Sequence, residues 1–263
     1  MTSRPHHGPR LVVRFLVSVL VLSVTCVCHA QDSAVGDSPP AEADSKQKDE
    51  TKGKTDKPKT PWRSLIKHWE ACEFGGEGET AIKDGVVTLE YGDPLTGVRW
   101  AGPFEGEKKP SKKKDVAPLP RDNYELRWEC VRDEGFDFMC AVTFPVDKGH
   151  ASLVMGGWGG GITGISSIDG QDASDNQTTM FKAFENDQWY KARVRVEKAK
   201  ITVWIDGTLM FEQPRADHDF DIRFEMDPCT PLGIANFECT SRIKNIQLRK
   251  LDPSELAAVE TEE

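Results

Sequence analysis

The sequence predicts an all-β protein, a two-sheet antiparallel sandwich of the jelly-roll kind, over residues 61–251. Three observations lead to this prediction. Short segments alternate between apolar and polar residues with the period of a β-strand, 22 glycines and 16 prolines interrupt the chain, and no long apolar stripe at helical spacing occurs. A segment of about 190 residues is long enough to bury one sizeable core.

The first thirty residues have the order of a secretory signal. Three arginines precede a mostly apolar run over 15–27, and the small residue Ala30 closes the segment. This order of regions places the expected cleavage after Ala30. The apolar run is also too short to span a bilayer comfortably. Lipid attachment at Cys26 is the alternative. The chain is therefore predicted to be secreted or held in the periplasm or cell envelope, without stable membrane insertion.

The segments that flank the predicted sandwich are polar. Residues 31–60 are rich in Asp, Glu, Lys, Ser and Pro, so they bury too little apolar surface to offset the entropy of ordering and are predicted to form a disordered tether. Residues 252–263 are predicted to form a frayed acidic tail. The net charge of −9 argues against a nucleic-acid partner.

The clearest hairpin prediction covers residues 190–206, with a two-residue turn at Lys198–Ala199. In this register one face is apolar throughout, and Arg193 lies opposite Trp204 on the other face. The apolar pairs are Val196 with Ile201, Val194 with Val203 and Ala192 with Ile205. In the closing strand, Ile246 and Leu248 are predicted core positions.

Another hairpin is predicted over residues 124–144, folded about Gly135, with Trp128 opposite Val142 and Cys130 opposite Cys140. Five cysteines follow the signal segment, an odd number, so at least one thiol has no partner within the chain. A Cys130–Cys140 disulfide and buried free thiols both remain open. The five are Cys72, Cys130, Cys140, Cys229 and Cys239.

Two further segments influence where a site is expected. Phe220, Ile222 and Phe224 alternate as the apolar face of a predicted strand, which leaves Arg223 and Glu225 on its other face. Residues 153–162 contain five glycines around Trp158. This Trp either stands exposed as a stacking platform or fills the core of a bulged strand.

Residues 189–196, 201–207 and 231–235 resemble strands of laminin-G-like and concanavalin-A-like sandwich domains. Within that group, residues 69–251 resemble secreted bacterial proteins of the 3-keto-disaccharide hydrolase family, in a divergent branch best known from planctomycete-like bacteria. The Asn-Ser-Gly and Glu-Val-Gln strands usual in the family are replaced here by residues 138–145 and the glycine-rich segment. The resemblance implies a concanavalin-A-like jelly roll and hydrolysis of a glycoside or keto-sugar.

Charged and aromatic residues on the predicted non-core faces suggest a sugar site. Aromatic rings stack on pyranose rings, while Arg and carboxylates orient the hydroxyls. Trp158, Arg193, Trp204 and Arg223 are the candidate ligand contacts, and Glu129 and Glu225 the candidate acid and base of glycoside cleavage. The alternative is a solvated outer face with ion pairs between strands.

A loop rich in hard oxygen ligands is a candidate calcium site, with solvated turns as the alternative. Its members are Asp169, Asp172, Asp175 and Asn176. Taken together, the sequence favours a secreted domain that binds glycan on one sheet face. Hydrolysis of a glycoside or 3-keto-disaccharide is the second hypothesis, and a structural or adhesive envelope module the third.

Overall fold

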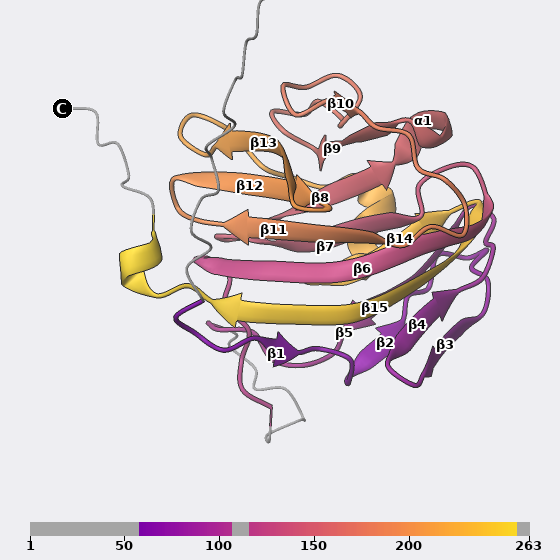
Figure 1. Ribbon diagram of the computed structural model, residues 1–263, viewed down its shortest axis with the longest axis horizontal. Helices are drawn as coiled ribbons and strands as arrows, with labels where there is room; N and C mark the ends of the chain where they lie inside the picture. The colour runs from indigo at the N-terminus through magenta and orange to yellow at the C-terminus, as the bar shows by residue number, and fades with distance from the viewer. Residues whose placement is uncertain (1–57, 107–115, 257–263) are drawn as a thin grey trace, which may run out of the picture. The chain divides into compact units, whose positions relative to one another are not determined.

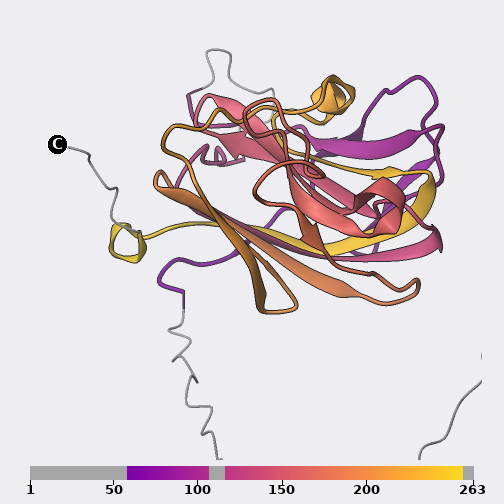
Figure 2. The same cartoon turned by 90° about the horizontal axis from the view of Figure 1, so that it is seen from above.

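The computed structural model describes residues 58–106 and 116–256. Almost all regular structure in them is β, and the strands form two antiparallel sheets, so the predicted two-sheet sandwich is confirmed (Figures 1 and 2). The predicted signal segment 1–30 and most of the predicted tether lie outside the described residues. No helix in the described part of the chain is both long and apolar enough to span a membrane.

Sheet A has eight strands, ordered β13-β12-β11-β6-β15-β4-β3, with β1 paired to β15. Its strands are β1 (Arg63–Ser64), β3 (Thr80–Lys83), β4 (Val86–Leu89), β6 (Tyr124–Gly135), β11 (Tyr190–Val196), β12 (Lys200–Ile205), β13 (Thr208–Pro214) and β15 (Cys239–Lys250).

Sheet B has seven strands, ordered β10-β9-β8-β7-β14-β5-β2. Its strands are β2 (Trp69–Ala71), β5 (Leu95–Trp100), β7 (Cys140–Val146), β8 (Gly149–Gly156), β9 (Ile162–Ser166), β10 (Met180–Phe181) and β14 (Gly233–Phe237). Three short helical segments complete the described fold: α1 (Gly157–Gly160) and the 3-10 helices η1 (Phe224–Cys229) and η2 (Pro253–Glu255).

The core lies between the sheets and is built from the alternate residues that point inward. On β6 these are Leu126, Trp128 and Cys130, and on β7 they include Val142 and Phe144. The inward residues are fully buried, whereas Arg127 on β6 is exposed. Alternation of this kind is what the pleat of a strand imposes when one face is packed.

The hairpin predicted over 190–206 is confirmed in its register. Ala192 pairs with Ile205, Val194 with Val203 and Val196 with Ile201. All six are buried, and Arg193 lies beside Trp204 on the outer face. Ile246 and Leu248 of β15 are also buried, as predicted.

The hairpin predicted over 124–144 is wrong. β6 pairs with β11 and β15 in sheet A, whereas β7 pairs with β8 and β14 in sheet B. Trp128 and Val142 belong to the same core, but they come from different sheets. The chain crosses between the sheets after Gly135, and Phe136 in the crossing segment is 63% exposed.

The crossing segment is held by a buried arginine. Arg132 Nη1 donates to the carbonyl oxygens of Phe136 and Asp137, at 2.9 Å each, and its Nε donates to Asn186 Oδ1 at 2.6 Å. The alternating pattern fixes which face of a strand is apolar. It does not fix the sheet to which the strand belongs. The apolar faces of two strands are buried equally well when the strands pair within one sheet and when they pack against each other across the sandwich.

All five cysteines are free and buried. Cys130 and Cys140 therefore act as core residues, and burial raises the pKa of the Cys140 thiol well above its ordinary value. Outside the main core, the Sγ atoms of Cys72 and Cys229 lie 3.7 Å apart. The open alternative of buried thiols is thus the one that the structure contains.

Residues on both sides of the predicted sandwich boundaries make defined contacts. Thr60 donates to the carbonyl oxygen of Lys250, and Lys59 bonds Ser254, so residues at the end of the predicted tether are anchored. The start of the predicted tail is also ordered, because Asp252 and Glu255 form a capping box around η2.

A second apolar cluster lies on the outer side of sheet B. Met226 and Cys229 of η1 pack there on outward residues of sheet B: Leu95, Ala141, Val154 and Ala235. Figure 2 shows η1 outside sheet B, on the side away from sheet A. This helix forms one wall of the hollow described next.

Candidate functional site

Each sheet has a hollow on its outer face, and the residues predicted to form one site are divided between them. Trp158, Arg223 and Glu225 line the hollow over sheet B, here called the sheet B pocket. Glu129, Arg193 and Trp204 line the hollow over sheet A, here called the sheet A groove.

The sheet B pocket has a volume of about 270 Å³ and a mostly apolar surface. Its floor consists of outward residues of sheet B, among them Leu95, Ala141, Ser152, Val154, Ser166 and Phe237, and its walls include Asp137, Phe138 and Met226. Small side chains at outward positions leave space that η1 and residues 136–138 enclose. An apolar hollow with a few polar groups is the usual form of a small-ligand site.

Several of these lining residues were not predicted as site residues. Ser152 and Ser166 alternate with buried apolar neighbours and therefore point to the outer face. That signal is readable in the sequence. Asp137, Phe138 and Met226 reach the pocket from segments outside the strands, and period-two patterning says nothing about such segments.

Trp158 stands at the pocket with 42% of its surface exposed, so it does not fill the core of a bulged strand. Its φ of 51° and ψ of 53° are left-handed, which is an uncommon conformation for a bulky side chain. The turn has little freedom to change. A Cβ at Gly160 would lie 2.3 Å from the carbonyl oxygen of Phe136, and Gly159 N donates to Asp137 Oδ2 at 2.9 Å.

A series of ion pairs and hydrogen bonds fixes the side chains on the polar side of the pocket. Arg223 Nη2 and Nε donate to the two oxygens of Glu225, at 2.9 and 3.3 Å, and Nη1 donates to Asp172 Oδ2 at 2.5 Å. Asp172 Oδ1 also accepts from Ser166 Oγ at 3.1 Å. The hydrogen bond from Arg223 lowers the pKa of the Glu225 carboxyl below its ordinary value, because it stabilises the carboxylate form.

The predicted strand with Phe220, Ile222 and Phe224 on one face is wrong. Phe220 makes only an isolated bridge to Ile168, and Phe224 begins η1 with 77% of its surface exposed. Arg223 and Glu225 lie on the same side because the 3-10 turn and their mutual ion pair bring them together, not because of strand alternation.

The four candidate calcium ligands have separate partners. Asp169 bonds His218 and Asp219, Asp172 bonds Arg223, Asp175 bonds Ser174, and Asn176 bonds the backbone of Ile165 and Gln171. Among residues 58–106 and 116–256, no three His, Cys, Asp or Glu side chains gather as metal ligands would. The structure thus offers no calcium cage in this loop.

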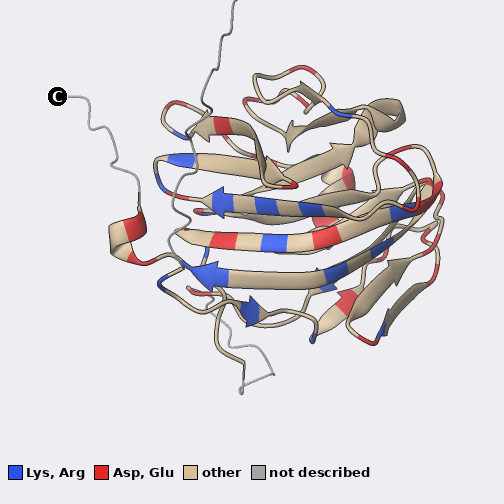
Figure 3. Cartoon of the chain, in the orientation of Figure 1, with Lys and Arg blue, Asp and Glu red and all other residues tan. Residues whose placement is uncertain are grey.

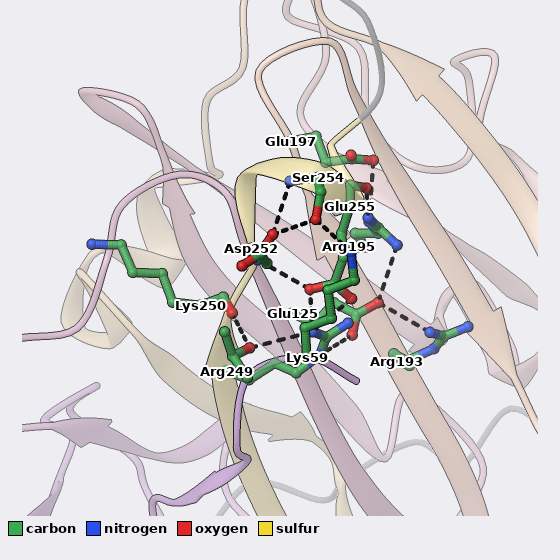
Figure 4. A network of polar contacts seen from close by, with 11 residues as sticks. Lys59, Glu125, Arg193, Arg195, Glu197, Arg249, Lys250, Asp252, Ser254 and Glu255 are labelled. Atoms are coloured by element: carbon green, nitrogen blue, oxygen red, sulfur yellow. Dashed lines mark hydrogen bonds and ion pairs between the residues drawn. The ribbon is translucent and has the colours of Figure 1, made fainter. Parts of the chain in front are cut away.

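In the sheet A groove, Arg193 covers one face of Trp204, with the guanidinium carbon 3.7 Å from the ring centroid. Arg193 Nη1 also donates to Glu125 Oε1 at 3.0 Å. Glu125 is almost fully buried and lies 2.6 Å from Arg249 and 3.7 Å from Arg195 (Figure 4). The cation–π contact gives the indole a packing partner on the charged face.

Glu129 and Glu225 cannot act as one acid–base pair. Glu129 points outward from sheet A, where it accepts from Asn245 Nδ2 at 2.9 Å and lies 3.6 Å from Lys244 Nζ. Glu225 lies over the outer face of sheet B, so the complete core separates the two carboxyl groups. A pair that cleaves a glycoside must flank one bond, within about 10 Å of each other.

The family model for the 3-keto-alpha-glucoside-1,2-lyase-like domain matches residues 56–249. The chain belongs to this family. The predicted resemblance is therefore confirmed over nearly the whole described sandwich. Comparison with curated proteins gives no match.

Solved structures with similar chain traces are sandwiches at low sequence identity. A carbohydrate-binding module from Bacillus subtilis has 10% identity and a TM-score of 0.44, covering 72% of this chain and 100% of the module. A putative glycosyl hydrolase from Parabacteroides distasonis has 10% identity and a TM-score of 0.44, over 73% and 94%. Domain 4 of an extracellular arabinanase from Geobacillus stearothermophilus, in complex with arabinotriose, has 18% identity and a TM-score of 0.42, over 74% and 85%.

Proposed function

We propose that this is an exported, glycan-directed domain that binds a short carbohydrate in the sheet B pocket. The exposed Trp158, held in a left-handed turn beside an apolar floor, is the observation that carries the proposal. Backbone strain of this kind is retained where the surrounding structure fixes it, and it gathers at ligand sites. The indole offers a stacking surface, and the Arg223–Glu225 pair offers fixed donors and acceptors for hydroxyls.

The size of the pocket favours a small ligand. Its volume of about 270 Å³ lies just below the range of about 300–1,000 Å³ that is usual for drug-sized ligands. One or two sugar rings fit this scale. The sheet A groove offers a less suitable stacking surface, because Arg193 already covers one face of Trp204.

Binding is tested by screening the domain on a glycan array and by calorimetry with the glycans that it retains. Trp158→Ala is expected to abolish binding while the circular dichroism spectrum stays unchanged. The matched control is Trp204→Ala, an indole removed from the other outer face, which is expected to bind normally. Loss of binding in the control but not in Trp158→Ala would place the site over sheet A instead.

A second function, cleavage of a 3-keto-glucoside, is favoured by family membership together with the position of the Glu225 carboxylate in the pocket. A ketone at C3 acidifies the hydrogen at C2. Glu225 would remove that proton as a general base, the electron pair would form the C1–C2 double bond, and the C1–O bond would break. The leaving oxygen takes up a proton, so the products are an unsaturated keto-sugar and an alcohol.

Glu225→Gln separates the two functions. If the domain cleaves 3-keto-glucosides, this variant is expected to lose at least about a hundredfold in kcat and still bind substrate. Glu129→Gln is the control, since Glu129 lies on the opposite sheet. A wild-type domain that neither binds glycans nor releases product would overturn both functions and favour a structural or adhesive envelope module.

A further inference from the structure

The sheet A groove has an organisation that sugar binding over sheet B does not explain. It is a hollow of about 460 Å³ between outward side chains of β6, β11, β12 and β15, and its surface is more polar than that of the sheet B pocket. The charged, aromatic and amide side chains that line it include Arg127, Glu129, Lys191, Arg193, Trp204 and Gln247. Figure 3 shows basic residues along β11 and β15, with both signs alternating on β6.

The arginine and lysine side chains of this groove have N–H groups that no described side chain accepts from. Arg127 donates from Nε and Nη2 to Gln247 Oε1, at 2.8 and 2.6 Å, and Arg193 donates from Nη1 to Glu125. Among the described residues, no side chain bonds Arg127 Nη1, Arg193 Nη2 or the Lys191 ammonium. Three positive groups thus face one hollow, in a chain whose net charge is −9.

Glu129 is the one carboxylate among the described residues that line the groove, and it is already neutralised. Glu129 accepts from Asn245 at 2.9 Å and lies 3.6 Å from Lys244, whose ammonium in turn lies 3.8 Å from the Trp189 ring centroid. Glu125 is buried beneath the surface and is surrounded by three arginines. The accessible part of the groove therefore presents positive charge and hydrogen-bond donors.

Two indoles hold the guanidinium groups in place. The guanidinium carbon of Arg127 lies 4.0 Å from the Trp62 ring centroid, and that of Arg193 lies 3.7 Å from the Trp204 centroid. Stacked guanidiniums lose little further side-chain entropy when they bind an anion, because their orientation is already fixed. Trp204 also gives the groove an apolar wall.

We propose that the sheet A groove is a second binding site, separate from the sheet B pocket, for a carboxylate-bearing segment of an acidic polysaccharide. The planar forks of Arg127 and Arg193 match the geometry of a uronate carboxylate, and Lys191 adds a third cation beside them. The indole adds an apolar contact for the sugar ring, although Arg193 covers one of its faces. A domain with both sites would hold an acidic polymer on one face while the other face engages a short glycan.

The probe is a set of oligogalacturonates of defined length, with their carboxyl-reduced neutral counterparts as the paired ligand. The wild-type domain is expected to bind the uronates, with a Kd that rises as salt is added, and not the neutral oligomers. Lys191→Ala is expected to raise the Kd about fivefold and Lys191→Glu more than about tenfold. Lys191 has no ion pair among the described residues, so both variants should fold.

Two control variants decide the interpretation. Lys83→Ala removes an exposed lysine from β3, at the edge of the same sheet, and Trp158→Ala removes the platform of the sheet B pocket. Both are expected to bind oligogalacturonate as the wild type does. Equal weakening by Lys83→Ala would reveal nonspecific adsorption of a polyanion, and loss in Trp158→Ala would show a single site over sheet B. Either of these results would overturn the proposal. Absence of uronate binding, or equal binding of sulfated oligomers that lack carboxylates, would also overturn it.

Discussion

The outer face of sheet A carries charged side chains that are largely paired with one another, whereas that of sheet B carries small and apolar side chains under a 3-10 helix. Glu125 joins Arg193, Arg195 and Arg249 on sheet A. On sheet B, Met226 of η1 packs on residues such as Ala141 and Val154. The two outer faces are therefore stabilised in different ways. An ion-pair network fixes the side chains on sheet A, and a second apolar cluster fixes those on sheet B.

Both faces depend on the core between them, so the largest expected effect is a change in that core. Trp128 is 2% exposed and belongs to the cluster that both sheets share. Trp128→Ala is expected to lower the free energy of unfolding by about 3 to 5 kcal/mol, measured by chemical denaturation. A loss below about 1 kcal/mol would contradict the inward placement of Trp128.

The sheet A face is tested by removing the charge that its arginines share. Glu125→Gln keeps the shape of the side chain but leaves Arg193, Arg195 and Arg249 without their common carboxylate. We expect the free energy of unfolding to fall by about 3 kcal/mol, because breaking a buried ion pair leaves uncompensated charge. Glu129→Gln is the control, with a loss below about 1 kcal/mol, since Glu129 is partly exposed.

The two faces can also be compared by how their carboxylates make the free energy of unfolding depend on pH. Hydrogen bonds from Arg249 lower the pKa of Glu255 on the sheet A side, and a hydrogen bond from Arg223 lowers that of Glu225 on the sheet B side. A carboxyl whose pKa is lower in the folded state stabilises the fold above its unfolded pKa of about 4.5, and that stabilisation is lost as pH falls through the folded pKa.

Glu255→Gln and Glu225→Gln are therefore each expected to be less stable than the wild type at pH 7. The difference should vanish near pH 2, and denaturation midpoints measured across this range provide the check. A variant that differs from the wild type equally at both pH values would show that its carboxylate contributes through packing rather than through charge.

The smallest expected effect on stability concerns the turn that presents Trp158. Because residue 158 is left-handed, Trp158→Gly is expected to be more stable than Trp158→Ala by about 1 kcal/mol, although both remove the indole. Neither variant should bind the glycan of the sheet B pocket. Equal thermal and chemical stability of the two variants would contradict the strained turn.

The sequence predicted much of the fold because strand alternation is a local property. The register of β11 and β12, with Val194 opposite Val203, follows from an apolar face and a two-residue turn that lie within seventeen residues. The same pattern placed Arg193 beside Trp204. Arg193 and Trp204 were therefore predicted correctly as neighbours, although their cation–π contact was not foreseen.

The tertiary structure decided which strands share a sheet. Trp128 and Val142 have matching apolar faces, but nothing in their local pattern distinguishes pairing within one sheet from packing across two. For the same reason Glu129 and Glu225 looked like partners in the sequence and lie on opposite sides of the molecule. The placement of η1 over sheet B, which creates the pocket, depends on contacts between segments far apart in the chain.

What the sequence by itself determined is the fold class, the inward and outward faces of the regular strands and the family. What only the tertiary structure decided is the division of the candidate residues between two hollows, the exposure of Trp158 and the ion pair between Arg223 and Glu225. The physical reason is that alternation acts between neighbouring residues, whereas a site is assembled by strand pairing and packing over long sequence separations.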